Sequence, residues 1–153
     1  MKKALYIFVQ CTWGILQTLV GFVVFLCNIK KPHALYHGAV LTEWPSRSSI
    51  SLGMFVFVYN GRASRLKVQP NARGVFADKG LIVHEYGHTI QSLFLGPLYL
   101  AVIGIPSLLW ARLPYYIKKR KEGAPYSAFW TERGADRLGE RTTRERSFTN
   151  TEM

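Results

Sequence analysis

The sequence predicts an α+β fold, in which helices flank a β-hairpin or small antiparallel sheet. Two apolar stretches frame a middle section rich in β-branched and aromatic residues, and this alternation points to mixed secondary structure beside a membrane. The chain has 153 residues, which fits one compact domain with its membrane segments and leaves no room for a second independent core.

The first apolar stretch, residues 4–27, is predicted to be one transmembrane helix. Such a helix would be about 36 Å long, enough to cross a hydrocarbon core of about 30 Å with some tilt. A secretory signal peptide is the alternative, but no small-x-small cleavage site precedes Asn28. Cys11 and Cys27 would lie about 24 Å apart on this helix, too far for a disulfide. We therefore expect residues 1–29 to be an uncleaved membrane anchor.

The section after this anchor is predicted to form strands. Residues 50–59 are rich in β-branched and aromatic side chains and end at Asn60-Gly61, a strong hairpin signal. Residues 62–69 would then form the return strand. Residues 35–42 are a weaker strand candidate.

A helix is predicted to begin at Lys79, because the side chain of Asp78 can cap its first turn. It would continue as far as Gly96-Pro97, which interrupt the helical pattern. The apolar segment 93–113 is just long enough to cross a bilayer. Its internal Gly and Pro residues predict a broken or re-entrant path instead.

The polar C-terminal section is predicted to hold one more helix over residues 127–140. Residues 141–153 are predicted to be a flexible basic tail, because their composition cannot form a core. Residues 30–140, including the second apolar segment, would then make a single domain.

The helix predicted at residue 79 carries the sequence His84-Glu85-Tyr86-Gly87-His88. Two histidines four residues apart share one helix face, with Cβ atoms about 5–6 Å apart, and can bind one Zn²⁺. Glu85 lies one step around the helix, where it can act as a general base without being a ligand. Gly87 lowers helix propensity, which indicates that another backbone approaches closely here.

A catalytic zinc site needs a third protein ligand and an open position, whereas a structural site uses a fourth ligand. Glu132 and Asp136 share one face of the predicted C-terminal helix. Glu132 can be the third ligand, and Asp136 can accept a hydrogen bond from a ligating histidine. The alternative for Glu132 is a solvated carboxylate. Glu132 could meet the histidines only if residues 93–113 did not carry the chain across the bilayer, because a crossing would place it about 30 Å away.

His33 and His37 repeat the four-residue spacing without a carboxylate between them, and we interpret them as incidental.

H-E-x-x-H followed by E-x-x-x-D resembles the gluzincin metallopeptidases. The stretch 132–139 resembles the Glu-x-x-Ala-Asp helix of the integral-membrane CAAX prenyl protease and the bacterial heat-shock membrane protease. The resemblance covers two helices. It implies a small membrane-anchored zincin-like domain, with zinc bound by His84, His88 and Glu132 and with Glu85 as general base.

These features predict a membrane-embedded zinc metallopeptidase that hydrolyses peptide bonds of a membrane-proximal substrate. An edge of strand 50–59 could bind an extended peptide as an added strand. Hydrolysis of another acyl bond, such as a lipid amide, would use the same groups. A non-catalytic membrane-anchored interaction protein with a structural or vestigial metal site is the alternative, and a basic adaptor using residues 118–121 is a third. The candidate oxyanion donors are Tyr115, Tyr116, Tyr126 and His33.

The net charge of +11 fits an anionic membrane surface better than nucleic acid, because many basic residues flank apolar segments and no nucleic-acid module appears. Of 20 Lys and Arg residues, two precede the first apolar stretch, eight lie between Lys30 and Lys79, and ten follow from Arg112 onward. The positive-inside rule then places the metal site on the cytoplasmic side of the cell (inner) membrane. The expected partners are the bilayer and a peptide or protein substrate.

Overall fold

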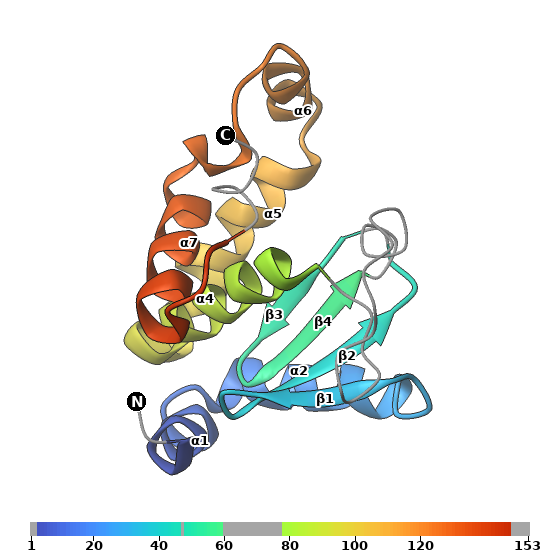
Figure 1. Ribbon diagram of the computed structural model, residues 1–153, viewed down its shortest axis with the longest axis vertical. Coiled ribbons are helices and arrows are strands. Elements are labelled where there is room, and N and C mark those ends of the chain that lie inside the picture. The colour runs from blue at the N-terminus through green and yellow to red at the C-terminus, as the bar shows by residue number, and fades with distance from the viewer. Residues whose placement is uncertain (1–2, 47, 60–77, 148–153) are drawn as a thin grey trace.

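The computed structural model describes residues 3–46, 48–59 and 78–147. This part of the chain has the predicted α+β fold, with helices on both faces of a small sheet (Figure 1). The sheet has four strands in the order β1-β2-β4-β3. The strands are β1 (His33–Tyr36), β2 (Ala39–Trp44), β3 (Ile50–Leu52) and β4 (Phe55–Tyr59).

The first apolar stretch forms two helices, α1 (Lys3–Thr12) and α2 (Ile15–Cys27), which meet at an angle of 98°. The prediction of one continuous helix is therefore wrong. Gln10 and Gln17 lie on either side of the corner and are completely buried. Their amides need hydrogen-bond partners, and the bend lets both side chains reach the protein interior.

Among the described residues, no single helix is both long and apolar enough to cross a membrane. Two bent pairs meet the length and composition requirement when each pair is taken together. One is α1 with α2, and the other is residues 100–112 with the helix that follows them.

The sheet is mixed and not purely antiparallel as predicted. β1 pairs with β2 and β3 pairs with β4 in antiparallel register, whereas β2 and β4 are parallel. His37 and Gly38, both at positive φ, form the turn between β1 and β2, so the predicted strand 35–42 is interrupted there. The predicted strand 50–59 is likewise two strands, because Gly53 takes a positive φ and turns the chain. The predicted hairpin at Asn60-Gly61 and its return strand lie outside the described residues.

Helix α4 runs from Lys79 to Leu95, as predicted. Its first turn is capped by Asp78, whose carboxylate accepts a hydrogen bond from the Leu81 amide at 3.0 Å. The helix ends at Gly96, which has a positive φ.

Helices α4 and α2 pack on opposite faces of the sheet (Figure 1). Alternation along β4 supplies both interfaces, since neighbouring side chains of a strand point to opposite faces. Val56 and Val58 belong to the cluster that includes Tyr86 of α4. Phe55 and Phe57 pack against the α2 side. The sheet thereby gives α4 a rigid support.

The second apolar segment is broken, as predicted. Its elements are η1 (Gly96–Leu98), the π-helical turn η2 (Leu100–Gly104) and α5 (Ile105–Arg112). The chain then bends by 64° into α6 (Pro114–Lys121), where Leu113 is extended. A 3₁₀ turn, η3 (Tyr126–Ala128), leads into α7 (Trp130–Thr143), which packs along α4.

Helix α7 extends beyond the predicted boundary at residue 140, so the prediction that the chain is flexible from residue 141 is wrong for the end of this helix. After the helix, Glu145 accepts a hydrogen bond from the Tyr36 hydroxyl at 2.7 Å and forms an ion pair with Lys79 at 2.9 Å. These contacts fix the chain to β1 and to the start of α4. Residues 148–153 lie outside the described part.

Candidate metal centre

Helices α4 and α7 touch backbone to backbone at two points. A Cβ on Gly87 would collide with the carbonyl oxygen of Ala135, and a Cβ on Gly139 would collide with the carbonyl oxygen of Val83. The prediction that Gly87 admits another backbone is confirmed. This close approach brings the α7 carboxylates to the α4 histidines.

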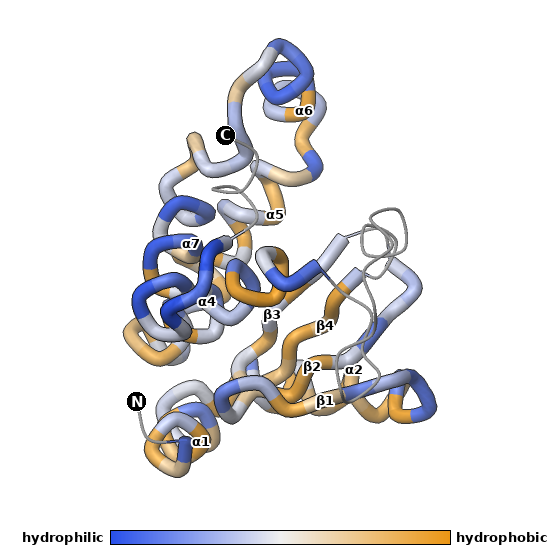
Figure 2. Tube along the Cα trace, viewed as in Figure 1, coloured by the Kyte–Doolittle hydropathy of each residue, from blue (hydrophilic) through white to orange (hydrophobic). Residues whose placement is uncertain are grey.

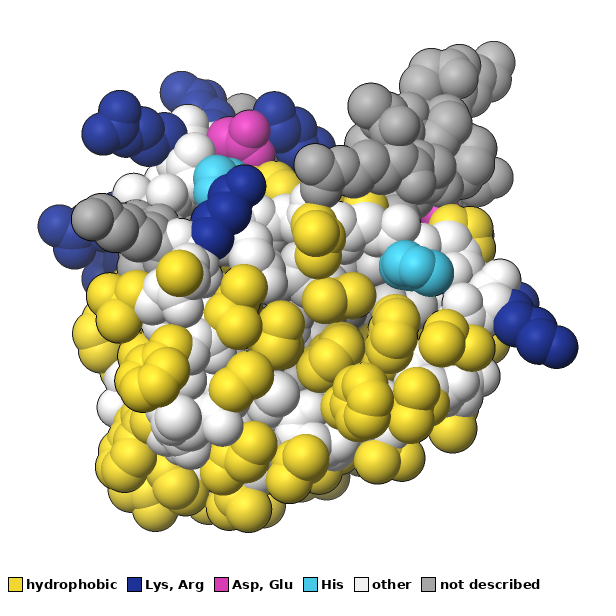
Figure 3. Space-filling view, turned by 90° about the horizontal axis from the view of Figure 1, so that it is seen from below, with side chains coloured by type: hydrophobic (Ala, Val, Ile, Leu, Met, Phe, Trp, Pro, Cys, Tyr) yellow, Lys and Arg dark blue, Asp and Glu magenta, His cyan; other side chains and the backbone are white. Residues whose placement is uncertain are grey.

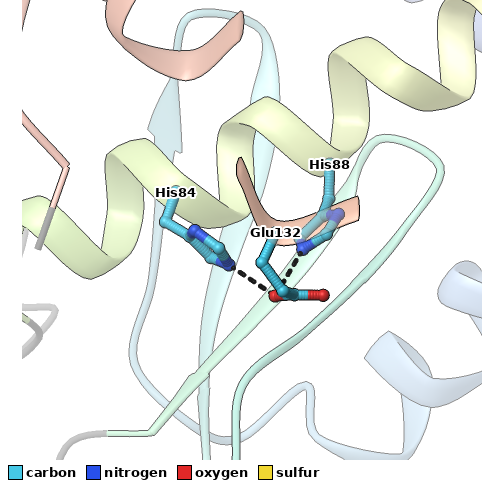
Figure 4. Close-up of side chains that lie close together, drawn as sticks. All are labelled: His84, His88 and Glu132. Carbon is cyan, nitrogen blue, oxygen red and sulfur yellow. Dashed lines mark ion pairs between the residues drawn. The ribbon is translucent and has the colours of Figure 1, made fainter. Parts of the chain in front are cut away.

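Three side chains converge where the two helices meet (Figure 4). Glu132 Oε2 lies 3.2 Å from His84 Nε2 and 3.5 Å from His88 Nε2. All three residues are buried, Glu132 with only 1% of its surface exposed. Their ligand atoms lie within 4.8 Å of one another, so the group can hold a metal ion. The structure therefore brings together the three residues that the sequence predicted as ligands.

The spacing and the environment of these atoms fit a cation. Ligand atoms about 2.0–2.2 Å from a tetrahedral zinc lie about 3.3–3.5 Å from each other, close to the two distances from Glu132 Oε2. Among the described residues, this buried oxygen has no hydrogen-bond partner. A buried carboxylate oxygen that faces two imidazole nitrogens is costly unless a positive charge lies between them, and a cation bound by Glu132 and the two histidines would supply that charge.

The outer nitrogens of both imidazoles are held by side chains of α4 and α7. His84 Nδ1 lies 2.8 Å from Asp136 Oδ1, as predicted, and His88 Nδ1 lies 2.8 Å from Gln91 Oε1. Gln91 Nε2 donates to the carbonyl of Thr131 at 2.8 Å, so Gln91 Oε1 is left to accept from His88. Both imidazoles can therefore carry their proton on Nδ1 and present a lone pair on Nε2.

Contacts within the cluster shift the pKa values of His84 and Glu132. Burial alone would lower the pKa of His84, but its contacts with Asp136 and Glu132 outweigh burial and raise that pKa. Burial alone would raise the pKa of Glu132, but the two histidines hold it well below its usual range. Without a metal, a proton on His84 compensates the carboxylate, and a divalent cation would replace that proton.

Replacing Asp136 by Asn is expected to weaken zinc binding about 10–100-fold, because the charge that orients and polarises His84 is lost. Zinc affinity is measured by competition with a chromophoric chelator. Arg137→Gln, at the neighbouring exposed position of α7, is the control and should bind zinc like the wild type. Equal affinities of the Asp136→Asn variant and the wild type would show that this hydrogen bond does not support the site.

A cavity of about 1120 Å³ adjoins the cluster and includes Glu85 in its wall. The Glu85 carboxylate lies 2.7 Å from Ser51 Oγ on β3, and the same hydroxyl lies 2.8 Å from the Glu85 carbonyl oxygen. Ser51 thus holds the predicted general base at the cavity. Sequence reasoning missed Ser51, because nothing local in a short strand indicates which helix it contacts.

Tyr126 is the one predicted oxyanion donor that lines this cavity. Its ring centroid lies 6.1 Å from that of His84. Burial, reinforced by the charge of Glu132, raises the pKa of Tyr126, so its hydroxyl stays protonated and able to donate. The other three candidates are not part of the cavity wall: Tyr115, Tyr116 and His33.

Comparison with family models, with curated proteins and with solved structures finds no match to this chain. The candidate site therefore stands on its own geometry: two imidazole nitrogens and a carboxylate around one point, with a second carboxylate beside them in a cavity. What the arrangement can do follows from the chemistry of those four groups.

Proposed function

We propose that this chain is a zinc-dependent metallopeptidase of the gluzincin type, acting on peptide bonds close to a membrane. The observation that carries the proposal is the position of Glu85. It lines the same cavity as His84, His88 and Glu132 without belonging to the ligand cluster. Two histidines, one glutamate and an adjacent carboxylate that is not a ligand are the set that zinc-assisted hydrolysis requires.

The donor set favours zinc. Two imidazole nitrogens and one carboxylate oxygen are ligands that zinc accepts, and three protein ligands leave one position open. When bound, Zn²⁺ polarises a substrate carbonyl and lowers the pKa of a water molecule.

The residues of the chain have separate roles in the proposed reaction. Glu85 takes the proton of the attacking water and passes it to the leaving amine. Ser51 keeps the Glu85 carboxylate directed into the cavity. Tyr126 donates a hydrogen bond to the oxygen that becomes negative as the carbonyl carbon turns tetrahedral.

The edge strand β3 supports a peptide as the substrate. It pairs with β4 alone among the described strands, and all three of its residues line the cavity. An extended peptide added beside β3 would meet the Tyr99 hydroxyl, which donates to the Ser51 carbonyl at 3.3 Å, and would run past Glu85, since Ser51 at the middle of this strand contacts it.

A membrane-anchored interaction protein with a structural metal site is the second candidate. The burial of the cluster favours it, because structural sites are closed to solvent. The cavity beside Glu85 favours catalysis instead, because a structural site needs no such space.

The proposal is tested with the full chain purified in detergent and a mixture of unstructured peptides, analysed by mass spectrometry. We expect cleavage that stops after the metal is removed with a chelator and returns when zinc is added. Cleavage that a chelator leaves unchanged would contradict the proposal. A zinc-loaded chain that cleaves no peptide would favour the structural site.

A further inference from the structure

Helices α1 and α2 turn Gln10, Gln17 and Thr18 inward and large apolar side chains outward. The buried amide of Gln10 donates to the carbonyl of Thr89 at 2.9 Å, and that of Gln17 donates to Ser92 Oγ at 2.8 Å. The outward side chains include Phe8, Trp13, Leu19 and Val23, all of them exposed. A helix facing water shows the opposite arrangement, so this polarity indicates an apolar surrounding.

The exposed apolar side chains continue from these helices onto the second apolar segment. Gly96 at the start of η1 lies against the ring of Trp13 at the corner of the first pair. On either side of Gly96 along the chain, Phe94, Leu98 and Ile105 are all more than half exposed. We call the exposed apolar side chains of α1, α2 and residues 94–109 the apolar face.

Seen from below, most of one side of the molecule is hydrophobic (Figure 3). Lys and Arg side chains gather along one edge of that view and at one side of it. The hydropathy trace shows the same separation, with apolar colouring over α1 and α2 and polar colouring over α6 and α7 (Figure 2). A contiguous apolar surface that covers most of one side of a molecule marks an interaction site.

Basic residues follow both apolar segments. Lys30 and Lys31 come directly after α2, and residues 118–121 end α6, which follows α5. Their side chains are charged ends on apolar stems, suited to reach from an apolar layer to phosphate groups. This charge complements a leaflet rich in anionic lipid, and it gives no advantage to a second copy of an equally basic chain.

We propose that the apolar face lies among the acyl chains of an anionic leaflet, with Lys30, Lys31 and residues 118–121 at the level of the headgroups. The cytoplasmic leaflet is the one rich in anionic lipid, so this basic surface favours it. The buried glutamines fit this placement, because their amide nitrogens donate to groups within the protein and neither side chain faces lipid.

This placement in the leaflet also determines the level of the membrane at which a substrate would enter the cavity. This inference rests on the proposed function. Ile105 and Leu108 are exposed and also line the cavity. Arg112 and Arg120, at the basic end of the same segment, line it as well. One wall of the cavity therefore passes from the acyl-chain level to the headgroup level. The favoured substrate is a peptide segment held at the membrane surface.

The two native cysteines are probes for this contact. Cys11 and Cys27 are both exposed, one on each helix of the bent pair. Each is labelled alone with an environment-sensitive fluorophore, in full-length Cys27→Ala or Cys11→Ala protein reconstituted into phosphatidylglycerol–phosphatidylcholine vesicles. We expect both labels to be quenched by nitroxides on the lipid acyl chains and to be shielded from aqueous iodide.

A matched control places the label on the polar side. Arg137→Cys, exposed on α7, is made in a chain that lacks both native cysteines and should be quenched by iodide and not by the nitroxide lipids. Native-site labels that behave like this control would overturn the proposal. Labels shielded from both quenchers would overturn it too, because a second copy of the chain would then cover the face. Neither quenching measurement depends on zinc or on turnover. A negative result for the proposed peptidase function would therefore leave the test of the membrane contact unaffected.

The headgroup contact has its own test. Replacing Lys118, Lys119 and Lys121 by Gln should weaken binding to phosphatidylglycerol vesicles by about fivefold per lysine at low salt, and leave binding to pure phosphatidylcholine vesicles unchanged. Equal binding of this variant and the wild type to both vesicles would overturn the assignment of these lysines to the headgroup layer.

Discussion

Glu85→Gln is expected to lower turnover about 10²–10⁴-fold while zinc remains bound. The amide has almost the shape of the carboxylate and can still accept a hydrogen bond from Ser51, which lies 2.7 Å away. It cannot take a proton from water, so the step assigned to Glu85 is lost. The measurements are the rate of cleavage of a peptide that the wild type hydrolyses and the zinc content of the same sample.

The matched control is Glu122→Gln, which removes an exposed carboxylate outside the cavity and should leave the rate unchanged. Wild-type turnover by the Glu85→Gln variant would contradict the proposed role. Loss of both zinc and turnover would show that Glu85 supports the metal site itself, contrary to the position that the structure gives it.

Gly87→Ala is expected to separate α7 from α4. The new methyl group would meet the backbone carbonyl of Ala135, which cannot move aside without shifting α7. Overpacking at such a contact destabilises a protein by about 1–3 kcal/mol. It would also move Glu132 away from the histidines, so zinc affinity should fall further than in the Asp136→Asn variant.

Gly104→Ala is the matched control, because its Cβ would lie at ordinary contact distances from the Leu100 side chain (3.6 Å) and the Tyr99 carbonyl oxygen (3.9 Å). It should stabilise its helix by up to about 1 kcal/mol. Denaturant unfolding and zinc titration of both variants in detergent provide the test. A Gly87→Ala protein with wild-type stability and zinc affinity would show that the two helices do not need this backbone contact.

The ligand set could be predicted because its signals are local. His84 and His88 share a helix face through their spacing alone, and Asp78 marks where that helix begins. The same spacing pairs Glu132 with Asp136. No local signal predicts that the two helices lie side by side. That prediction required the chemical argument that a zinc site needs a third ligand, and the structure brings Glu132 to the two histidines.

The bend between α1 and α2 could not be read from the apolar run. A count of apolar residues treats Gln10 and Gln17 as tolerable exceptions, whereas they are the residues that face the protein. Whether a polar residue in an apolar helix faces lipid or protein depends on the tertiary contacts of that helix. The sequence of the helix alone does not give these contacts.

The sheet was the least predictable part. Its parallel β2–β4 pairing joins strands that are separated along the chain by β3. Gly38 and Gly53 mark the two turns, but an apolar run with an internal glycine also fits one bulged strand. Ser51 belongs to the site only because β3 lies beside α4, a contact that no spacing rule encodes.

The central claim is that His84, His88 and Glu132 hold one divalent cation, and metal content tests it most directly. The full-length wild type, purified in detergent without added metal, should contain one zinc per chain by mass spectrometry. His84→Ala and Glu132→Ala should contain none, and Glu122→Gln should retain the wild-type amount. A wild type without a stoichiometric metal ion, or a Glu132→Ala protein that keeps its zinc, would contradict the account.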